Sequence, residues 1–173
     1  LSCGFFTKNV SAATKTGVVT ISGKTYYVKE DGSKAKGWMQ LGKYKYYFNK
    51  KTGVQQKGWM VDRKGRKRYF TSKAGVMLTG WLKDSKGNRR FFDPDTGFMT
   101  TGWIELEGET YYMYKKSGVA ATGWVTNKKG AKRYFSQDDC TMMTGWAKSE
   151  SNYNRYSHDE SDIMYTGLKH EGE

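Results

Sequence analysis

The chain has 173 residues and a formal net charge of +13, a length that suits a single domain of the usual roughly 100–200 residues. Leu, Ile, Val and Phe together make up about 15% of the residues, a share that with this charge would indicate disorder, yet aromatic residues make up 16%. The composition therefore excludes a conventional aliphatic-core enzyme domain, a collagen-like chain and a coiled coil. It indicates a protein whose apolar surface consists of aromatic rings.

Residues 1–16 lack the charged region and long apolar stretch of a signal peptide. We interpret them as an N-terminal leader or the end of a preceding segment, and residues 17–173 as one repeat region. No run approaches the roughly 18 apolar residues of a membrane span, so no membrane insertion is predicted. The two cysteines, Cys3 and Cys140, are too few for a disulfide framework, and zinc-ligand spacing is absent. We expect no metal and no cofactor.

From residue 17 onward the sequence repeats with a short period. A glycine precedes every tryptophan, and successive Gly-Trp pairs are 21 or 22 residues apart. One further step in either direction reaches Gly17-Val18 and Gly167-Leu168, so the terminal copies have lost the tryptophan, as capping repeats do. The six tryptophans are Trp38, Trp59, Trp81, Trp103, Trp124 and Trp146.

Each period also contains two adjacent aromatic residues, except the last, which has Tyr156 alone, and the first ring lies 8 or 10 residues after the tryptophan. Because the two spacings differ by an even number, we expect the first ring of every pair to share a face with its tryptophan. Turn residues such as those of Asp62–Gly65 lie in between, which predicts one β-hairpin per repeat. The first rings are Tyr46, Tyr69, Phe91, Tyr111, Tyr134 and Tyr156.

A further glycine lies six residues before most of the tryptophans, and we expect it to adopt a positive φ in the connection to the next hairpin. In the sixth copy Cys140 takes this place, and an exposed, unreactive thiol is expected there. A single hairpin is not stable in water, whereas stacked hairpins are. The predicted fold class is all-β, a β-hairpin solenoid of about seven 20–22-residue repeats. We expect the tryptophan and one ring of each pair to fill the gap between neighbours.

This pattern of Gly-Trp, paired aromatics, glycine and Gly-Trp again resembles the bacterial cell-wall-binding repeat superfamily, from about Gly17 to Leu168. That superfamily includes choline-binding repeats, glucan-binding repeats and the C-terminal repeats of clostridial toxins. The resemblance implies ligand sites in the grooves between hairpins, where aromatic cages hold the quaternary ammonium of choline on teichoic acids. It assigns the six tryptophans and the six first rings named above as ligand-binding residues.

One position departs from the choline-binding pattern. The residue just before the aromatic pair supplies a further cage wall in choline-binding members, and a cation at this place repels choline. Such a cation suits sugar hydroxyls or the phosphates of an anionic polymer instead. The residues before the pairs are Lys45, Arg68, Arg90, Thr110, Arg133 and Arg155.

The predicted function is therefore that of a non-catalytic binding module of a secreted bacterial protein at the cell surface. Its partner would be a choline-bearing or anionic teichoic-acid-type wall polymer. A glucan or host-glycan binder and a structural or dimerising stalk remain as alternatives, and a homodimer is left open. Nucleic acid is not expected, since surface-protein repeats argue against an intracellular partner. No catalytic residue is predicted, because neither His158 nor His170 lies in a motif that places a base beside a nucleophile.

Overall fold

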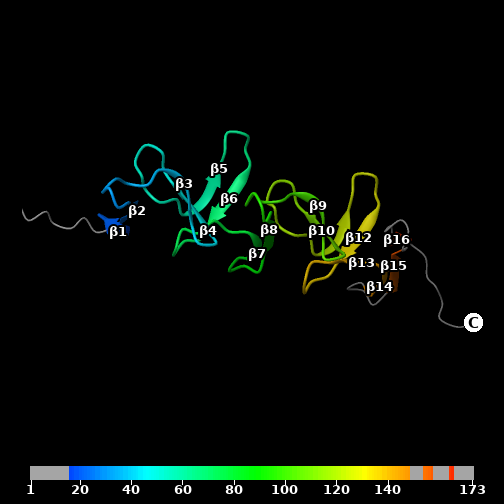
Figure 1. Ribbon diagram of the computed structural model, residues 1–173. Coiled ribbons are helices and arrows are strands. Elements are labelled where there is room, and N and C mark those ends of the chain that lie inside the picture. Colours follow the sequence, from blue (N-terminus) through cyan, green and yellow to red (C-terminus); the bar gives the residue numbers. More distant parts are fainter. Residues whose placement is uncertain (1–15, 149–153, 158–163, 166–173) are drawn as a thin grey trace, which may run out of the picture. The chain divides into compact units, whose positions relative to one another are not determined.

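The structure is a computed structural model that describes residues 16–148, 154–157 and 164–165, with side chains for residues 16–144. These residues form strands and turns and contain no helix, and hence none that could cross a membrane. The strands form seven antiparallel hairpins, so the predicted all-β hairpin-repeat fold is confirmed. The chain divides into two compact units, residues 1–77 and 78–173, which are described separately (Figure 1). The expected boundary at residues 16 and 17 stays a prediction.

The first unit contains three hairpins, β1–β2, β3–β4 and β5–β6. Each has aromatic residues in its strands and a short polar tip, which favours antiparallel pairing. The strands are β1 (Gly17–Ile21), β2 (Lys24–Val28), β3 (Gly37–Leu41), β4 (Tyr44–Phe48), β5 (Gly58–Val61) and β6 (Lys67–Phe70).

The second unit contains four hairpins, and in its last two a short third strand joins the sheet. Its first strands are β7 (Gly80–Lys83), β8 (Arg89–Phe92), β9 (Gly102–Leu106), β10 (Glu109–Met113), β11 (Gly123–Thr126) and β12 (Lys132–Phe135). They are followed by β13 (Met142–Met143), β14 (Gly145–Lys148), β15 (Asn154–Ser157) and β16 (Met164–Tyr165).

Two kinds of turn close the hairpins. β3–β4 closes with two residues, because Leu41 pairs with Tyr44, and β1–β2 and β9–β10 do the same. β5–β6 closes with the five residues 62–66, in which Asp62 N–H donates to the Arg66 carbonyl at 3.0 Å and Gly65 has a φ of 77°. The turns of β7–β8 and β11–β12 repeat this arrangement. Type I turns followed by a left-handed glycine close hairpins in this way.

The turn length corrects the expected face of the aromatic pairs. Two and five differ by an odd number, so the pairing register of the short hairpins is shifted by one residue relative to the long ones. Trp59 pairs with Tyr69, the first ring of its pair, as predicted. Trp38 and Trp103 pair instead with the second rings, Tyr47 and Tyr112. The prediction that Tyr46 and Tyr111 share the tryptophan face is therefore wrong, because the spacing of 8 or 10 residues also counts the turn.

The core is built from the residue that pairs with the glycine of each Gly-Trp. These side chains are almost completely buried, whereas Trp38, Trp59, Trp81 and Trp103 remain 39–52% exposed. The expectation that the tryptophans fill the gaps between hairpins is thus only partly met. The buried side chains are Phe48, Phe70, Phe92, Met113 and Phe135.

Backbone hydrogen bonds connect consecutive hairpins within each unit. After each hairpin the chain turns back and runs beside the second strand of that hairpin, a stretch that we call the return segment. One residue of the return segment donates its N–H to a carbonyl of the preceding hairpin. Gln55 donates to the Thr25 carbonyl, Met77 to that of Lys45 and Ala120 to that of Arg89, each at 2.8 Å. The return segments therefore fix the face that each hairpin presents to its predecessor.

The expected left-handed glycines are present, with φ between 65° and 79° at Gly32, Gly53, Gly75, Gly97 and Gly118. At Gly118 there is no room for a side chain, because an added Cβ would lie 2.4 Å from the sulfur of Met99. Cys140 has the corresponding conformation, with a φ of 70°. It is not exposed as predicted but 3% accessible, in a cluster with Phe91, Met113 and Ala120. Burial raises the pKa of its thiol.

Candidate functional site

Within each of the two units, a groove between consecutive hairpins is formed by two opposite faces. The tryptophan face of one hairpin holds the tryptophan and its cross-strand ring. The other face belongs to the following hairpin. It contributes the side chain of the residue that pairs, across the two strands, with the residue after that hairpin's own tryptophan. We call this place the wall position. This position holds tyrosine in the short hairpins and arginine in the long ones. The wall residues with described side chains are Tyr26, Tyr46, Arg68, Arg90, Tyr111 and Arg133.

The wall position corrects the departure noted in the sequence. Lys45 and Thr110 precede their aromatic pairs, but the register of the short hairpins assigns the wall position to Tyr46 and Tyr111. A cation therefore occupies it only in the long hairpins. Two different kinds of groove follow from this single difference.

The groove around Trp38 has an arginine wall. The Trp38 ring lies 5.1 Å from its cross-strand partner Tyr47 and 6.0 Å from Phe70 of the next hairpin, between ring centroids. The guanidinium of Arg68 lies over the Trp38 ring, 5.1 Å from its centroid. A cation thus already covers this ring, held by the attraction between guanidinium and aromatic face.

The groove around Trp103 repeats this arrangement 65 residues later. Trp103 lies 4.9 Å from Tyr112 and 6.0 Å from Phe135, and the Arg133 guanidinium lies 5.2 Å from its ring centroid. Tyr114, whose centroid is 5.8 Å from that of Tyr112, adds a further ring.

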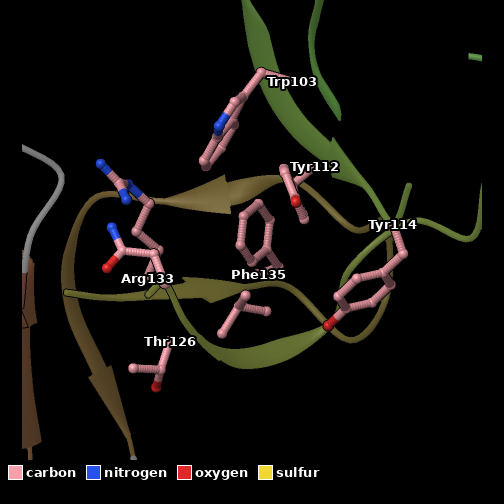
Figure 2. Close-up of a pocket in the computed structure, with 8 residues that line it drawn as sticks. Trp103, Tyr112, Tyr114, Thr126, Arg133 and Phe135 are labelled. Carbon is pink, nitrogen blue, oxygen red and sulfur yellow. The ribbon is translucent and has the colours of Figure 1, made fainter. Parts of the chain in front are cut away.

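This groove opens into a pocket of about 390 Å³ (Figure 2), within the usual range of small-molecule sites. Figure 2 shows the rings of Trp103, Phe135 and Tyr114 around it, with Arg133 on the side away from Tyr114. Its lining consists of Trp103, Tyr112, Tyr114, Val125, Thr126, Asn127, Arg133 and Phe135.

The groove around Trp81 has an aromatic wall. Trp81 meets its cross-strand partner Phe91 at 5.2 Å and an interplanar angle of 66°, and the wall residue Tyr111 at 5.1 Å and 60°. Phe91 belongs to the buried cluster that contains Cys140, and Tyr111 packs against that cluster, so packing fixes the positions of both rings. Trp81 itself is 39% exposed. We call these three rings, Trp81, Phe91 and Tyr111, the Trp81 cage.

Negative charge acts on the Tyr111 ring of the Trp81 cage. Burial raises the pKa of the Tyr111 hydroxyl, and the carboxylates of Asp139, Glu109 and Glu107 raise it further. The phenol therefore stays neutral at physiological pH, and the same carboxylates favour a cation beside it. Asp139 is ionised to unusually low pH, because hydrogen bonds from Thr141 and Ser136 lower the pKa of its carboxyl.

The Trp103 pocket has a cationic side chain, Arg133, in its lining instead. The β7–β8 and β11–β12 turns have the same backbone, but they begin with Asp84 and Asn127 respectively. Asp84 Oδ1 accepts from the N–H groups of Lys86 and Asn88, and Asn127 Oδ1 accepts from the corresponding N–H groups of Lys129 and Ala131.

Only the aspartate also neutralises the wall arginine. Asp84 pairs with Arg90 at 2.9 Å, and hydrogen bonds from Asn88 and Arg90 lower the pKa of its carboxyl far below the ordinary value. Asn127 cannot do this for Arg133, and no carboxylate in the described part of the chain forms an ion pair with that arginine.

The structure brings the predicted site residues together only in part. The tryptophans pair with Tyr69, Phe91 and Tyr134 as expected, and Trp124 lies 5.1 Å from Tyr134. Tyr46 and Tyr111 instead face the preceding hairpin as wall residues. The side chains of Trp146 and Tyr156 lie outside the described residues. The ligand-binding roles of all these residues stay predictions.

Sequence reasoning missed Tyr47, Tyr112 and Tyr114. The signal that identifies Tyr47 and Tyr112 is the Gly-containing two-residue turn, which fixes the register. Among the described residues no three acidic, histidine or cysteine side chains gather in a group that could hold a metal ion.

Comparisons with known proteins agree with this geometry. The profile of a "choline-binding repeat" matches residues 64–101, and that of a "cell wall binding repeat" matches residues 17–34 and 101–120. The comparison with curated proteins finds no significant match.

Solved structures of similar fold come from Streptococcus pneumoniae. CbpJ is 26% identical with a TM-score of 0.77, and choline binding protein F, solved in the presence of a peptidoglycan analogue, is 29% identical with a TM-score of 0.76. A structure of CbpF in complex with ipratropium is 27% identical with a TM-score of 0.76. Each alignment covers 87% of this chain, which spans about half the length of those chains.

The hairpin repeats, the aromatic grooves and the matched profiles agree with one another, and repeats of this family are binding modules. The chain contains repeats of the choline-binding, cell-wall-binding type, matched over residues 17–34 and 64–120.

Proposed function

We propose that this chain binds choline-bearing polymers of the bacterial cell wall, and that the Trp81 cage holds the quaternary ammonium group. The observation that supports the proposal is the meeting of three rings, Trp81, Phe91 and Tyr111, at centroid distances of 5.1–5.2 Å with no cation of the protein at the wall position. A secreted protein that presents these repeats at the cell surface is the setting that this function requires.

The chemistry of choline suits this cage. Its trimethylammonium group has no N–H to donate, so it is attracted by ring faces and by nearby negative charge rather than by hydrogen bonds. A desolvated cation gains roughly 0.5–2 kcal/mol from each aromatic face. The carboxylates of Glu107, Glu109 and Asp139, whose charges act on Tyr111, add a favourable field. The Trp38 and Trp103 rings are already covered by Arg68 and Arg133, so they compete poorly for choline.

The test compares two tryptophans by isothermal titration with choline. Trp81→Leu should abolish the main binding event, while Trp103→Leu, at a similarly exposed ring, should leave it intact. Choline should bind more tightly than ethanolamine, because the latter's ammonium keeps its hydration. Retention on immobilised choline, with release by free choline, checks the same difference for the whole chain. Equal loss in both variants, or none in Trp81→Leu, would contradict the assignment.

A further inference from the structure

The Trp103 pocket differs in chemistry from the Trp81 cage, although both lie between consecutive hairpins of the same unit. It combines flat aromatic surfaces with a guanidinium, an amide and a hydroxyl, from Arg133, Asn127 and Thr126. Its volume of about 390 Å³ suits one sugar-sized group. A quaternary ammonium has no place here, because the Arg133 guanidinium already covers the Trp103 ring.

Arg133 retains its capacity to bind an anion. A guanidinium that stacks by its face on an aromatic ring still presents its N–H groups at the edge of the plane, where they match a carboxylate or a phosphate. In the β7–β8 hairpin the corresponding Arg90 donates to the Asp84 carboxylate at 2.9 Å and to the Ser117 carbonyl at 3.1 Å. In the β11–β12 hairpin the turn keeps its backbone hydrogen bonds but Asn127 supplies no charge.

The rest of that turn is also basic. Lys128, Lys129 and Lys132 flank Arg133 in sequence, and residues 127–133 contain no acidic side chain. A cluster of like charges beside an apolar wall raises the local concentration of anions. The pocket therefore has an aromatic surface for a ring, and in Arg133 a cation that forms no ion pair with the described carboxylates and can contact an acidic substituent on that ring.

We infer that the Trp103 pocket is an anion subsite for a sugar that bears a phosphate or a carboxylate, with Arg133 as its charged contact and Trp103 and Tyr112 as its ring contacts. The inference goes beyond the choline site and does not depend on it, since the two sites share no ring and attract ligands of opposite charge.

Three sugars with the same ring test this inference. Glucose 6-phosphate, glucuronate and glucose carry a phosphate, a carboxylate and no charge. Binding is followed by titration calorimetry and by the NMR signal of the Trp103 indole N–H, assigned with Trp103→Leu. At least one charged sugar should shift that signal and bind at least tenfold more tightly than glucose, and the phosphate and carboxylate arms identify which group is preferred.

The matched variant is Asn127→Asp, which restores the residue that two sister hairpins have at this place and preserves the turn. It should neutralise Arg133 and weaken binding of the charged sugar about tenfold, as should Arg133→Gln. Circular dichroism and thermal unfolding, which depend on neither ligand, show that each variant is folded. The inference is overturned if glucose binds as tightly as the charged sugars, if no sugar shifts the Trp103 signal, or if Asn127→Asp binds the charged sugar unchanged.

Discussion

The Trp81 cage and the Trp103 pocket are built from consecutive repeats with the same backbone plan, yet they differ in charge at every level. The wall residue is Tyr111 in one and Arg133 in the other. Carboxylates of Glu107, Glu109 and Asp139 act on the first, whereas residues 127–133 beside the second contain three lysines and no acid. One hairpin array thus contains two grooves for which we propose ligands of opposite charge.

The turn length explains why the two grooves differ so regularly. Among the hairpins whose turns are described, all three two-residue hairpins have tyrosine at the wall position, and all three five-residue hairpins have arginine there. A five-residue turn brings its first side chain within reach of the wall residue, as Asp84 reaches Arg90 at 2.9 Å. A two-residue turn has no such side chain, so a charged wall residue would lack this partner.

Exchanging the wall residues should have the largest effect on the difference in ligand binding between the two sites. Tyr111→Arg places a guanidinium over Trp81 and should weaken choline binding about tenfold or more, since it removes one ring contact and adds a like charge. The reciprocal Arg133→Tyr should create choline binding at Trp103. Calorimetry measures both effects. Tyr111→Phe, which keeps the ring, is the control and should retain at least most of the affinity. Unchanged binding in Tyr111→Arg would show that the wall does not select the ligand.

The packing beneath the Trp81 cage offers the next largest effect. Most return segments combine a large side chain with a glycine one repeat later, as Met99 does with Gly118. Beneath the cage this pair is Ala120 with Cys140. Ala120→Met should therefore overpack the cluster and lower the free energy of unfolding by roughly 1–3 kcal/mol, measured by urea denaturation. Adding Cys140→Gly restores the usual pair and should recover most of the loss. Additive losses in the double variant would refute this compensation.

The sequence predicted the repeat length, the all-β class and the left-handed glycines, because the Gly-Trp period and the turn residues are local signals. It did not predict which ring of each pair faces the tryptophan. That depends on where a strand ends and the turn begins, and Tyr46 and Tyr111 changed faces for this reason. Nor could it show that Arg68 and Arg133 stack on tryptophans of the preceding hairpin, since that contact depends on how hairpins are packed.

Raising the salt concentration should weaken ligand binding more in the Trp103 pocket than in the Trp81 cage, although by a smaller factor than the substitutions do. Exposed charges are screened at about 8–10 Å at physiological ionic strength, and Arg133 with its neighbouring lysines lies near the surface. Raising NaCl from 0.1 to 0.5 M should weaken the charged sugar at Trp103 several-fold. Choline at Trp81 should weaken by less than twofold, because ring faces supply most of the attraction. Parallel titrations at the two salt concentrations check this, and an equal response would contradict the assigned difference.

The smallest expected effect is that of pH on the Trp81 cage. Hydrogen bonds hold the pKa of the Asp139 carboxyl below its ordinary value of 3.8. A depressed carboxyl pKa means that the favourable interaction of the charged form is fully present above the unfolded value and is lost only as pH falls through the folded one. Choline binding should therefore change by less than twofold between pH 7 and pH 5 and decline below about pH 4. A decline centred near pH 6 would point to another titrating group, and Asp139→Asn, which removes the charge at every pH, should flatten the acid limb of the profile.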